Sequence, residues 1–291
     1  MTVETILSAI EKASTDPQQA LLNAAVLGLF MIALVVYTRL LGRLSQDGCR
    51  VRHDLFALPE ALSATVLMAL LGAGVAMHFL SAAKDVAVPA VVAPGPRKIL
   101  EGMLALALPA LALVLVIVIR GGRLRDVFGF GKVPVFRALL LALGLTLVAL
   151  PLILVAKTIT IALVGGSEPP QLLVQRFHDA LTGKNHTLIA TIAASAIFVA
   201  PVCEEIIFRG SFYPLIARML GRVPAAIVCA VLFGAVHDTV TDIPSLAVLA
   251  LCFTAAYERT GSLLVPIFMH AWFNTLSLVA MIWQMQPTLT P

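Results

Sequence analysis

The sequence predicts an all-α polytopic membrane protein. Apolar residues make up 60% of the 291, charged residues only 12%, and the mean hydropathy is +0.99. A soluble domain is typically about half apolar and a quarter charged. Apolar runs also recur at about the 20 residues that a helix needs to cross a bilayer. Because lipid admits only helices or closed barrels as spanning structures, a bundle of about eight transmembrane helices is expected.

Eight apolar segments are expected to form these helices. They lie at 20–39, 57–82, 98–120, 137–157, 187–209, 223–240, 243–258 and 261–284. Pro109 and Pro151 fall inside the third and fourth segments, where a proline kinks a membrane helix rather than ending it. Only 14 residues from Val223 precede His237, which is short for a span. The sixth helix is therefore expected either to begin below the cytoplasmic surface or to run on through Asp238 and Thr239.

Two regions are organised differently from the spans. Residues 3–10 repeat apolar side chains at helical spacing, which predicts a short interfacial helix, and the segment up to Gln19 holds one cation, so a cleaved signal peptide is not expected. The longest polar connection, 165–185, is expected to separate accessory N-terminal transmembrane helices (1–165) from a catalytic core (187–284).

The cations indicate topology rather than nucleic-acid binding, because they lie between the apolar runs and the formal charge is only +4. The loops after the first, third, fifth and seventh segments hold 13 of the 20 cations: Arg39, Arg43, Arg50, Arg52, Arg120, Arg123, Arg125, Lys132, Arg137, Arg209, Arg218, Arg222 and Arg259. The positive-inside rule then places both termini outside the cytoplasm. The four cysteines show no paired spacing and are expected to be small apolar side chains.

Glu204 and Glu205 stand at the end of an apolar segment, where ionisable groups are costly and usually functional. Adjacent residues point about 100° apart on a helix, so the two carboxylates are expected to differ in role. Glu205 precedes Arg209 by four residues, the spacing and order of an intrahelical ion pair. Glu204 is therefore the predicted catalytic carboxylate. The alternative is that both are solvated at the cytoplasmic end of the helix.

Two further motifs place imidazole and amide groups in apolar segments. Phe233-Gly-Ala-Val-His237 ends in a histidine, and His270 and Asn274 share one helix face. Two donors on one face suit an oxyanion site. The alternative for each is an interhelical hydrogen bond that only holds the helices together. No His-Glu-x-x-His helix, Gly-x-Ser-x-Gly elbow or phosphate-binding loop is present in the sequence.

These three motifs, in this order, resemble those of the CAAX protease and bacteriocin-processing (CPBP, or Abi) family of intramembrane endopeptidases. They read Glu204-Glu205-Ile-Ile-Phe-Arg209, Phe233-Gly-Ala-Val-His237 and His270-Ala-Trp-Phe-Asn274. The resemblance covers about residues 187–284, and residues 1–165 carry no family signal. It implies a helical core with a conical cavity and cleavage of peptide bonds near the membrane surface.

The resemblance also implies roles for single residues. Glu204 and His237 activate the attacking water, His270 and Asn274 stabilise the oxyanion, and Glu205 and Arg209 support the site, as does Phe233. Zinc held by Glu204, His237 and His270 is the alternative. Asn274 is a poor zinc ligand and a good oxyanion donor, so no cofactor is favoured.

The expected function is thus that of a multi-pass intramembrane endopeptidase in a bacterial cytoplasmic membrane, acting on a membrane-associated or lipidated protein or peptide. Three alternatives stay open: a CAAX prenyl endopeptidase proper, which needs a host that prenylates proteins, a zinc-dependent form, and a non-catalytic membrane scaffold. The expected partners are this substrate and the lipid bilayer, and nucleic acid is not expected as a partner.

Overall fold

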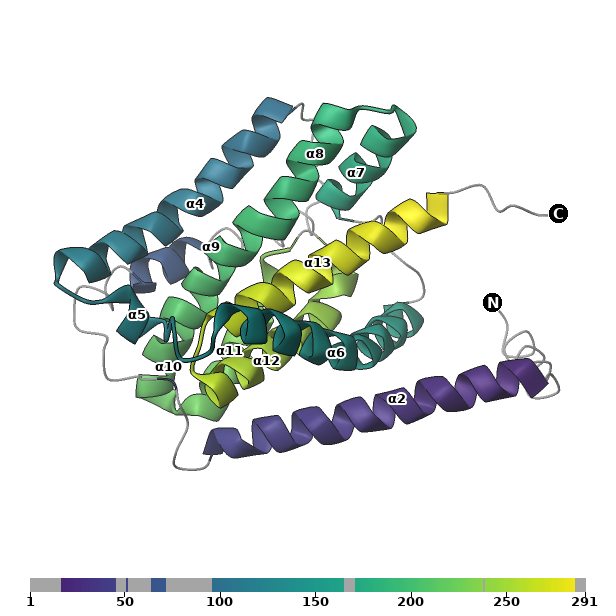
Figure 1. Ribbon diagram of the computed structural model, residues 1–291, viewed down its shortest axis with the longest axis horizontal. Helices are drawn as coiled ribbons and strands as arrows, with labels where there is room; N and C mark the ends of the chain where they lie inside the picture. Colours follow the sequence, from purple (N-terminus) through teal and green to yellow (C-terminus); the bar gives the residue numbers. More distant parts are fainter. Residues whose placement is uncertain are drawn as a thin grey trace.

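The computed structural model describes residues 17–45, 51, 64–71, 96–164, 171–237 and 239–285, and within these ranges the chain is helical and has no strand (Figure 1). The all-α prediction is confirmed. The helices are α2 (Pro17–Leu41), α4 (Pro96–Ile119), α5 (Leu124–Val127), α6 (Val135–Val164), α7 (Leu172–Thr182), α8 (His186–Ala194), α9 (Ala200–Ile207), α10 (Tyr213–Leu220), α11 (Arg222–Ala235), α12 (Ile243–Thr260) and α13 (Leu264–Met285).

Six helical stretches of the described residues are long and apolar enough to cross a membrane: 24–41, 99–119, 135–164, 186–220, 240–260 and 264–284. Two of the eight expected segments are not among them. Of segment 57–82 only 64–71 is described, and it is helical. The interfacial helix expected at 3–10 lies outside the described residues. Helices α4 and α6 continue through Pro109 and Pro151, as expected.

The sixth expected segment forms a short helix. Helix α11 ends at Ala235, before His237, so the alternative of a helix that runs on past His237 is wrong. The amide of His237 donates to the carbonyl of Gly234 (3.2 Å), which closes a tight turn. A Cβ on Gly234 would lie 2.6 Å from the carbonyl oxygen of Ile243, so glycine lets the chain return closely past the helix end. The turn leaves His237 just beyond α11.

The fifth segment is longer than expected. Residues 186–220 form one continuous helical stretch, α8 to α10, so the expected end at Arg209 is wrong. It contains two π-helical turns, η2 (Ser195–Val199) and η3 (Phe208–Phe212). At about 1.5 Å per residue it is roughly 50 Å long, more than the hydrocarbon core requires. The helix can continue past Arg209 because that cation is paired within the protein rather than solvated.

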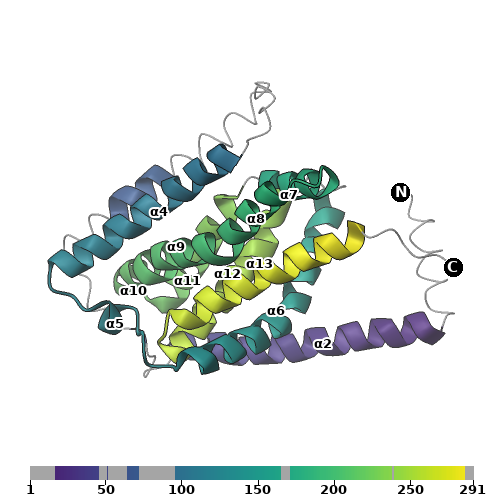
Figure 2. The same cartoon turned by 45° about the horizontal axis from the view of Figure 1, so that its top comes forward.

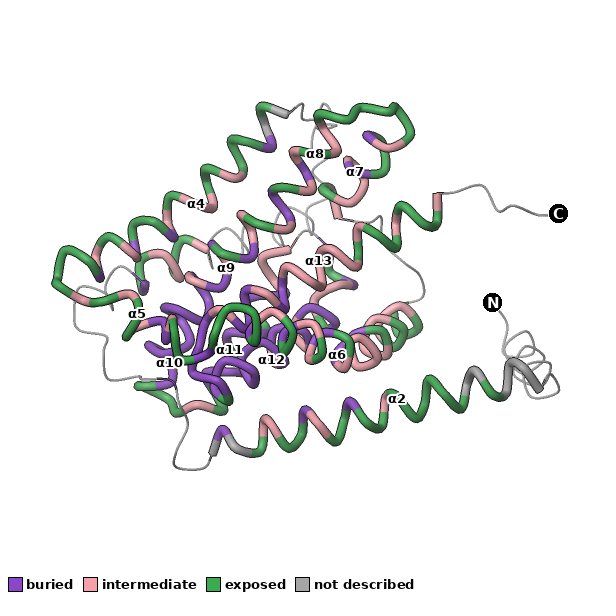
Figure 3. The backbone as a smooth tube through the Cα atoms, viewed as in Figure 1, coloured by how far each residue is buried: buried purple, intermediate pink, exposed green. Residues whose placement is uncertain are grey.

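Helix α12 lies in the middle of the bundle, and α6, α11 and α13 pack against it. Figure 2 shows α2 beside α6 at one side of the bundle and α4 beside α9 at the other. Buried residues concentrate around α10, α11 and α12 (Figure 3). The polar connection 165–185 is partly helical, because α7 lies within it. Free cysteines 203, 229 and 252 are buried, as expected for small apolar side chains.

The loops predicted to share one membrane side do meet. The amide of Leu263 donates to the carbonyl of Phe128 (2.9 Å). Gly129, at φ +67°, approaches Gly261 so closely that a Cβ would lie 1.7 Å from the carbonyl oxygen of Gly261. The connection after α4 therefore packs against the connection between α12 and α13. The start of α2 and the end of α13 lie at the opposite end of the bundle (Figure 1).

Candidate active site

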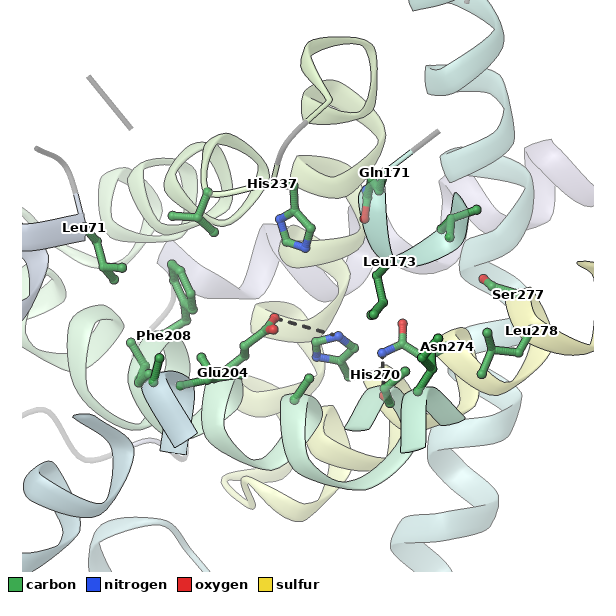
Figure 4. Close-up of a pocket in the computed structure, with 18 of the residues that line it drawn as sticks. Leu71, Gln171, Leu173, Glu204, Phe208, His237, His270, Asn274, Ser277 and Leu278 are labelled. Atoms are coloured by element: carbon green, nitrogen blue, oxygen red, sulfur yellow. Dashed lines mark hydrogen bonds and ion pairs between the residues drawn. The ribbon is translucent and has the colours of Figure 1, made fainter. Parts of the chain in front are cut away.

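The four predicted catalytic side chains line one cavity. It has a volume of about 460 Å³ and receives Glu204 from α9, His237 from the turn after α11, and His270 and Asn274 from α13. Most of the remaining lining is apolar, and it comes mainly from α4, α7, α9, α13 and the helical residues 64–71. In Figure 4 Glu204 and His270 face each other across the floor of the cavity, with His237 above them and Asn274 beside His270. Three motifs that are distant in sequence thus meet at one place.

Glu204 and Glu205 point to different surroundings, as predicted. Glu204 lines the cavity and its side chain is 17% exposed, whereas the side chain of Glu205 is fully buried. Both lie on α9, which spans only eight residues between the π turns η2 and η3. Each π turn adds a residue and rotates the following helix face by about 100°. The turn η2 precedes both glutamates and therefore sets which of them faces the cavity.

The predicted ion pair between Glu205 and Arg209 is present. Arg209 Nη1 donates to Glu205 Oε1 at 2.9 Å, and Nη2 donates to the carbonyl of Ala250 at 3.0 Å. The guanidinium also lies 4.8 Å from the ring centre of Phe233 and 5.2 Å from that of Phe253. Both charged side chains are fully buried. Pairing, hydrogen bonding and cation–π contacts offset the cost of removing these charges from water.

His270 lies between the two glutamates. Its Nδ1 is 3.2 Å from Glu205 Oε1, within hydrogen-bond range, and its Nε2 is 3.9 Å from Glu204 Oε2, which is ion-pair range only. Since a carboxylate oxygen accepts, Nδ1 carries the hydrogen of the first contact. The ring also packs against Phe253 and Phe233, at 5.4 and 5.7 Å between centroids. These contacts fix the direction in which Nε2 points.

His237 has a defined tautomer. Its Nδ1 is 2.8 Å from the carbonyl oxygen of Phe233, and a carbonyl can only accept, so Nδ1 is the donor. In the neutral ring Nε2 then carries a lone pair. The Phe233 ring contacts His237 (5.2 Å between centroids), His270 and Arg209. Phe233, predicted as a supporting residue, is thus in contact with three of the polar groups.

The side chains do not gather as a metal site would require. In the part of the chain that the structure describes, no group of three or more His, Cys, Asp or Glu residues is arranged to hold a metal ion. Glu204, His237 and His270 share a cavity without converging on one point, so as they lie here they do not fit zinc. We therefore derive no catalytic step through a metal.

Sequence reasoning missed several residues of the site. Ser277 lines the cavity and follows Asn274 by three residues, so its helix face could have identified it. Gln171, just before α7, also lines the cavity, but in the sequence it belongs to the polar connection 165–185, where no site residue was expected. Phe253 and the carbonyl of Ala250 hold Arg209, and no signal in the sequence pointed to either.

Comparison with known proteins agrees with the motifs. Residues 186–276 match the family model of the type II CAAX prenyl endopeptidase Rce1-like proteins. This part of the chain resembles the CAAX protease family, as the three motifs predicted. The matched segment begins with α8 and ends two residues after Asn274, so it contains every predicted site residue. The comparison with solved structures found no match.

Two curated relatives match part of the chain. The chain is 32% identical over 89 residues to membrane peptidase YdiL of Bacillus subtilis (strain 168), covering 31% of this chain and 35% of the relative. It is 28% identical over 96 residues to CAAX prenyl protease 2 of Homo sapiens, covering 26% and 29%. The chain thus spans about a third of the length of these relatives.

Proposed function

We propose that this protein is a membrane-embedded CAAX-type endopeptidase that hydrolyses peptide bonds at or near the membrane surface. The observation that carries the proposal is that Glu204, His237 and His270 line one cavity inside a bundle of membrane-length helices. Ionisable groups at such a position are expensive and usually functional. The similarity to membrane peptidase YdiL and CAAX prenyl protease 2 supports the same reaction class.

Glu204 is the proposed general base. Its Oε2 is buried and has no hydrogen-bond partner among the described residues, so it is available to a water molecule in the cavity. His237 presents the Nε2 lone pair to the same cavity and would orient that water. Glu204 takes a proton from the water as the oxygen of the water attacks the peptide carbonyl carbon. The proton then passes to the leaving nitrogen as the C–N bond breaks.

His270 and Asn274 are the proposed oxyanion donors. Because Nδ1–H of His270 is directed to Glu205, donation from Nε2 as well requires the imidazolium form. In that form the negative charges of Glu204 and Glu205 are balanced by the positive charges of Arg209 and His270. A balanced cluster is favourable in an interior of low dielectric constant. Asn274 would donate to the oxyanion the amide hydrogen that is not bound within the protein.

A CAAX prenyl endopeptidase proper is the second candidate, favoured by the similarity to CAAX prenyl protease 2. It would act on lipidated proteins and requires a host that prenylates them. For the first candidate, the proposed location is the bacterial cytoplasmic membrane. A non-catalytic scaffold would use the polar side chains only to hold the helices together.

The proposal is tested by comparing membrane peptidomes of cells that carry the wild-type chain, Glu204→Gln or Glu101→Gln. Glu101 is an exposed residue of α4 that pairs with Arg97, so its replacement is a matched control outside the cavity. Specific cleavage products are expected with wild type and Glu101→Gln and should be absent with Glu204→Gln. Unchanged products in the Glu204→Gln cells would refute the proposed catalytic role.

A further inference from the structure

A second cavity joins the candidate active site. It has a volume of about 700 Å³, within the usual range of ligand pockets, and lies between α6, α12 and α13. It shares six lining residues with the first cavity: Gln171, Val174, His237, His270, Asn274 and Ser277. The reactive groups thus stand where the two cavities meet. A peptide held across them could extend into both.

The two cavities differ in charge. Apart from the histidines that both cavities share, Glu204 is the charged side chain in the described lining of the first cavity. The second has no glutamate in its described lining and instead holds Lys157 of α6 and Asp242, which precedes α12. Lys157 is the one lysine or arginine in the described lining of either cavity. The second cavity therefore carries a cation, separate from the proposed imidazolium of His270, that could select a substrate by charge.

The contacts of this pair determine what it presents to the cavity. Lys157 Nζ pairs with Asp242 Oδ1 and donates to Thr241 Oγ1 at 3.3 Å. Asp242 Oδ2 accepts from Gln171 Nε2 at 3.1 Å. Both carboxylate oxygens are thus engaged, whereas the ammonium group has a third hydrogen to donate. The Lys157 side chain is 31% exposed and that of Asp242 is 18% exposed, so the lysine is the more accessible of the two.

We infer that Lys157 binds a carboxylate of the peptide substrate and so determines which peptides this protease accepts. The inference rests on the proposed function. A charge-assisted hydrogen bond from an ammonium group to a carboxylate is among the stronger polar contacts in proteins. The carboxylate is either the free C-terminus of the substrate or an acidic side chain. In both cases the segment on one side of the scissile bond lies in the second cavity, while Glu204 acts from the first.

The test uses the purified full chain and fluorogenic peptides built on a cleavage site from the membrane peptidome. Each peptide is made with a free C-terminal carboxylate, with a C-terminal amide, and with an amide plus one aspartate in the released segment. Wild type is expected to prefer a carboxylate by roughly 10–100-fold in kcat/KM, the value of one charge-assisted hydrogen bond. The difference should lie mainly in KM. Comparing the peptide that has a C-terminal carboxylate with the amide peptide that has an aspartate shows which carboxylate Lys157 binds.

Variants assign the preference to Lys157. Lys157→Met should abolish it, Lys157→Arg should retain it, and Lys184→Met, the same change at an exposed lysine outside both cavities, should not alter it. Because Lys157→Met leaves Asp242 unpaired, Lys157→Met/Asp242→Asn is made as a second variant that removes both charges. It should also lose the preference. The ratio of kcat/KM between two peptides is measured on one and the same variant. A purely structural role for Lys157 would therefore leave this ratio unchanged.

A wild-type enzyme that cleaves the amide and carboxylate peptides equally would overturn the inference. An unchanged ratio in both Lys157→Met and Lys157→Met/Asp242→Asn would also overturn it. Binding of the same labelled peptides to Glu204→Gln is measured in parallel. If wild type cleaves no peptide, the proposed function fails, and the binding ratio still tests Lys157. Carboxylate-selective binding that is lost on adding Lys157→Met supports the inference, and equal binding rejects it.

Discussion

Asn274 Nδ2 donates a hydrogen bond to the carbonyl oxygen of Ala196, at 2.7 Å. Ala196 lies in the π turn η2, which precedes the helix that carries Glu204. The bond therefore ties α13, with His270 and Asn274, to the stretch that orients Glu204, the proposed general base. It also uses one amide hydrogen of Asn274 and fixes the direction of the other. Asn274 can thus serve as an oxyanion donor only from a fixed orientation.

Replacing Asn274 by alanine is expected to lower turnover by about 10²–10³, the usual loss on removing one oxyanion donor. KM should change little, because the interaction develops in the transition state. Steady-state kinetics on a cleaved peptide measure both. Asn274→Asp, which has the same shape but no amide hydrogens, should lose as much turnover. Full activity in the aspartate variant would show that neither hydrogen is needed.

Glu204→Gln is expected to lower the rate by roughly 10²–10⁴, the contribution of a general base, while the protein remains folded and inserted. Glutamine keeps the size of the side chain but cannot take a proton from water. Single-turnover cleavage and a thermal melt in detergent measure the two properties. A variant with near wild-type cleavage would show that another group is the base.

Glu205→Ala is expected to destabilise the fold rather than to remove a reacting group. It would leave Arg209 buried with its carboxylate partner missing, and breaking a buried pair in this way costs roughly 3–5 kcal/mol. The measured result should be a lower melting temperature and lower expression. Glu205→Gln, which can still accept from Arg209 Nη1, serves as the milder control. Equal stability of the alanine variant and wild type would contradict the assigned role.

The sequence predicted relationships within one helix better than it predicted the helix ends. Glu205–Arg209 follows from spacing within one helix, and the shared face of His270 and Asn274 from the same rule. The end of α11 ahead of His237 does not follow from hydropathy, because it depends on the close approach of Gly234 to Ile243. The π turns could likewise not be predicted from the sequence, since an apolar pattern with a 3.6-residue period does not reveal one inserted residue.

Contacts between distant segments were the other part that could not be predicted. The carbonyl of Ala250 holds Arg209, and that of Ala196 holds Asn274. Backbone acceptors carry no residue-specific signal, so only the packed structure identifies them. The division into accessory and catalytic regions near residue 165 stays a prediction, although α4 and α6 of the first region contribute lining residues to the two cavities.

The orientation in the membrane is a further prediction. A reporter fused after Pro291 is expected outside the cytoplasm, because the loops rich in cations should face inward. A cysteine placed in loop 121–126 should be labelled only from the cytoplasmic side, in a background lacking the four native cysteines. The contact between Phe128 and Leu263 adds a check, since a cysteine at Arg259 should show the same sidedness. A cytoplasmic C-terminus would refute the orientation.

Metal content tests the proposed metal-free mechanism against the zinc alternative. If water is activated by Glu204 and His237 alone, the purified protein should hold far less than one zinc per chain, and a chelator should leave peptide cleavage unchanged. If zinc binds Glu204, His237 and His270, elemental analysis should find near-stoichiometric metal, and activity lost to a chelator should return with added zinc. His270→Ala supplies the control, because it removes a ligand in one mechanism and an oxyanion donor in the other. Stoichiometric zinc in wild type that is lost in His270→Ala would overturn the metal-free mechanism and leave the proposed protease activity intact.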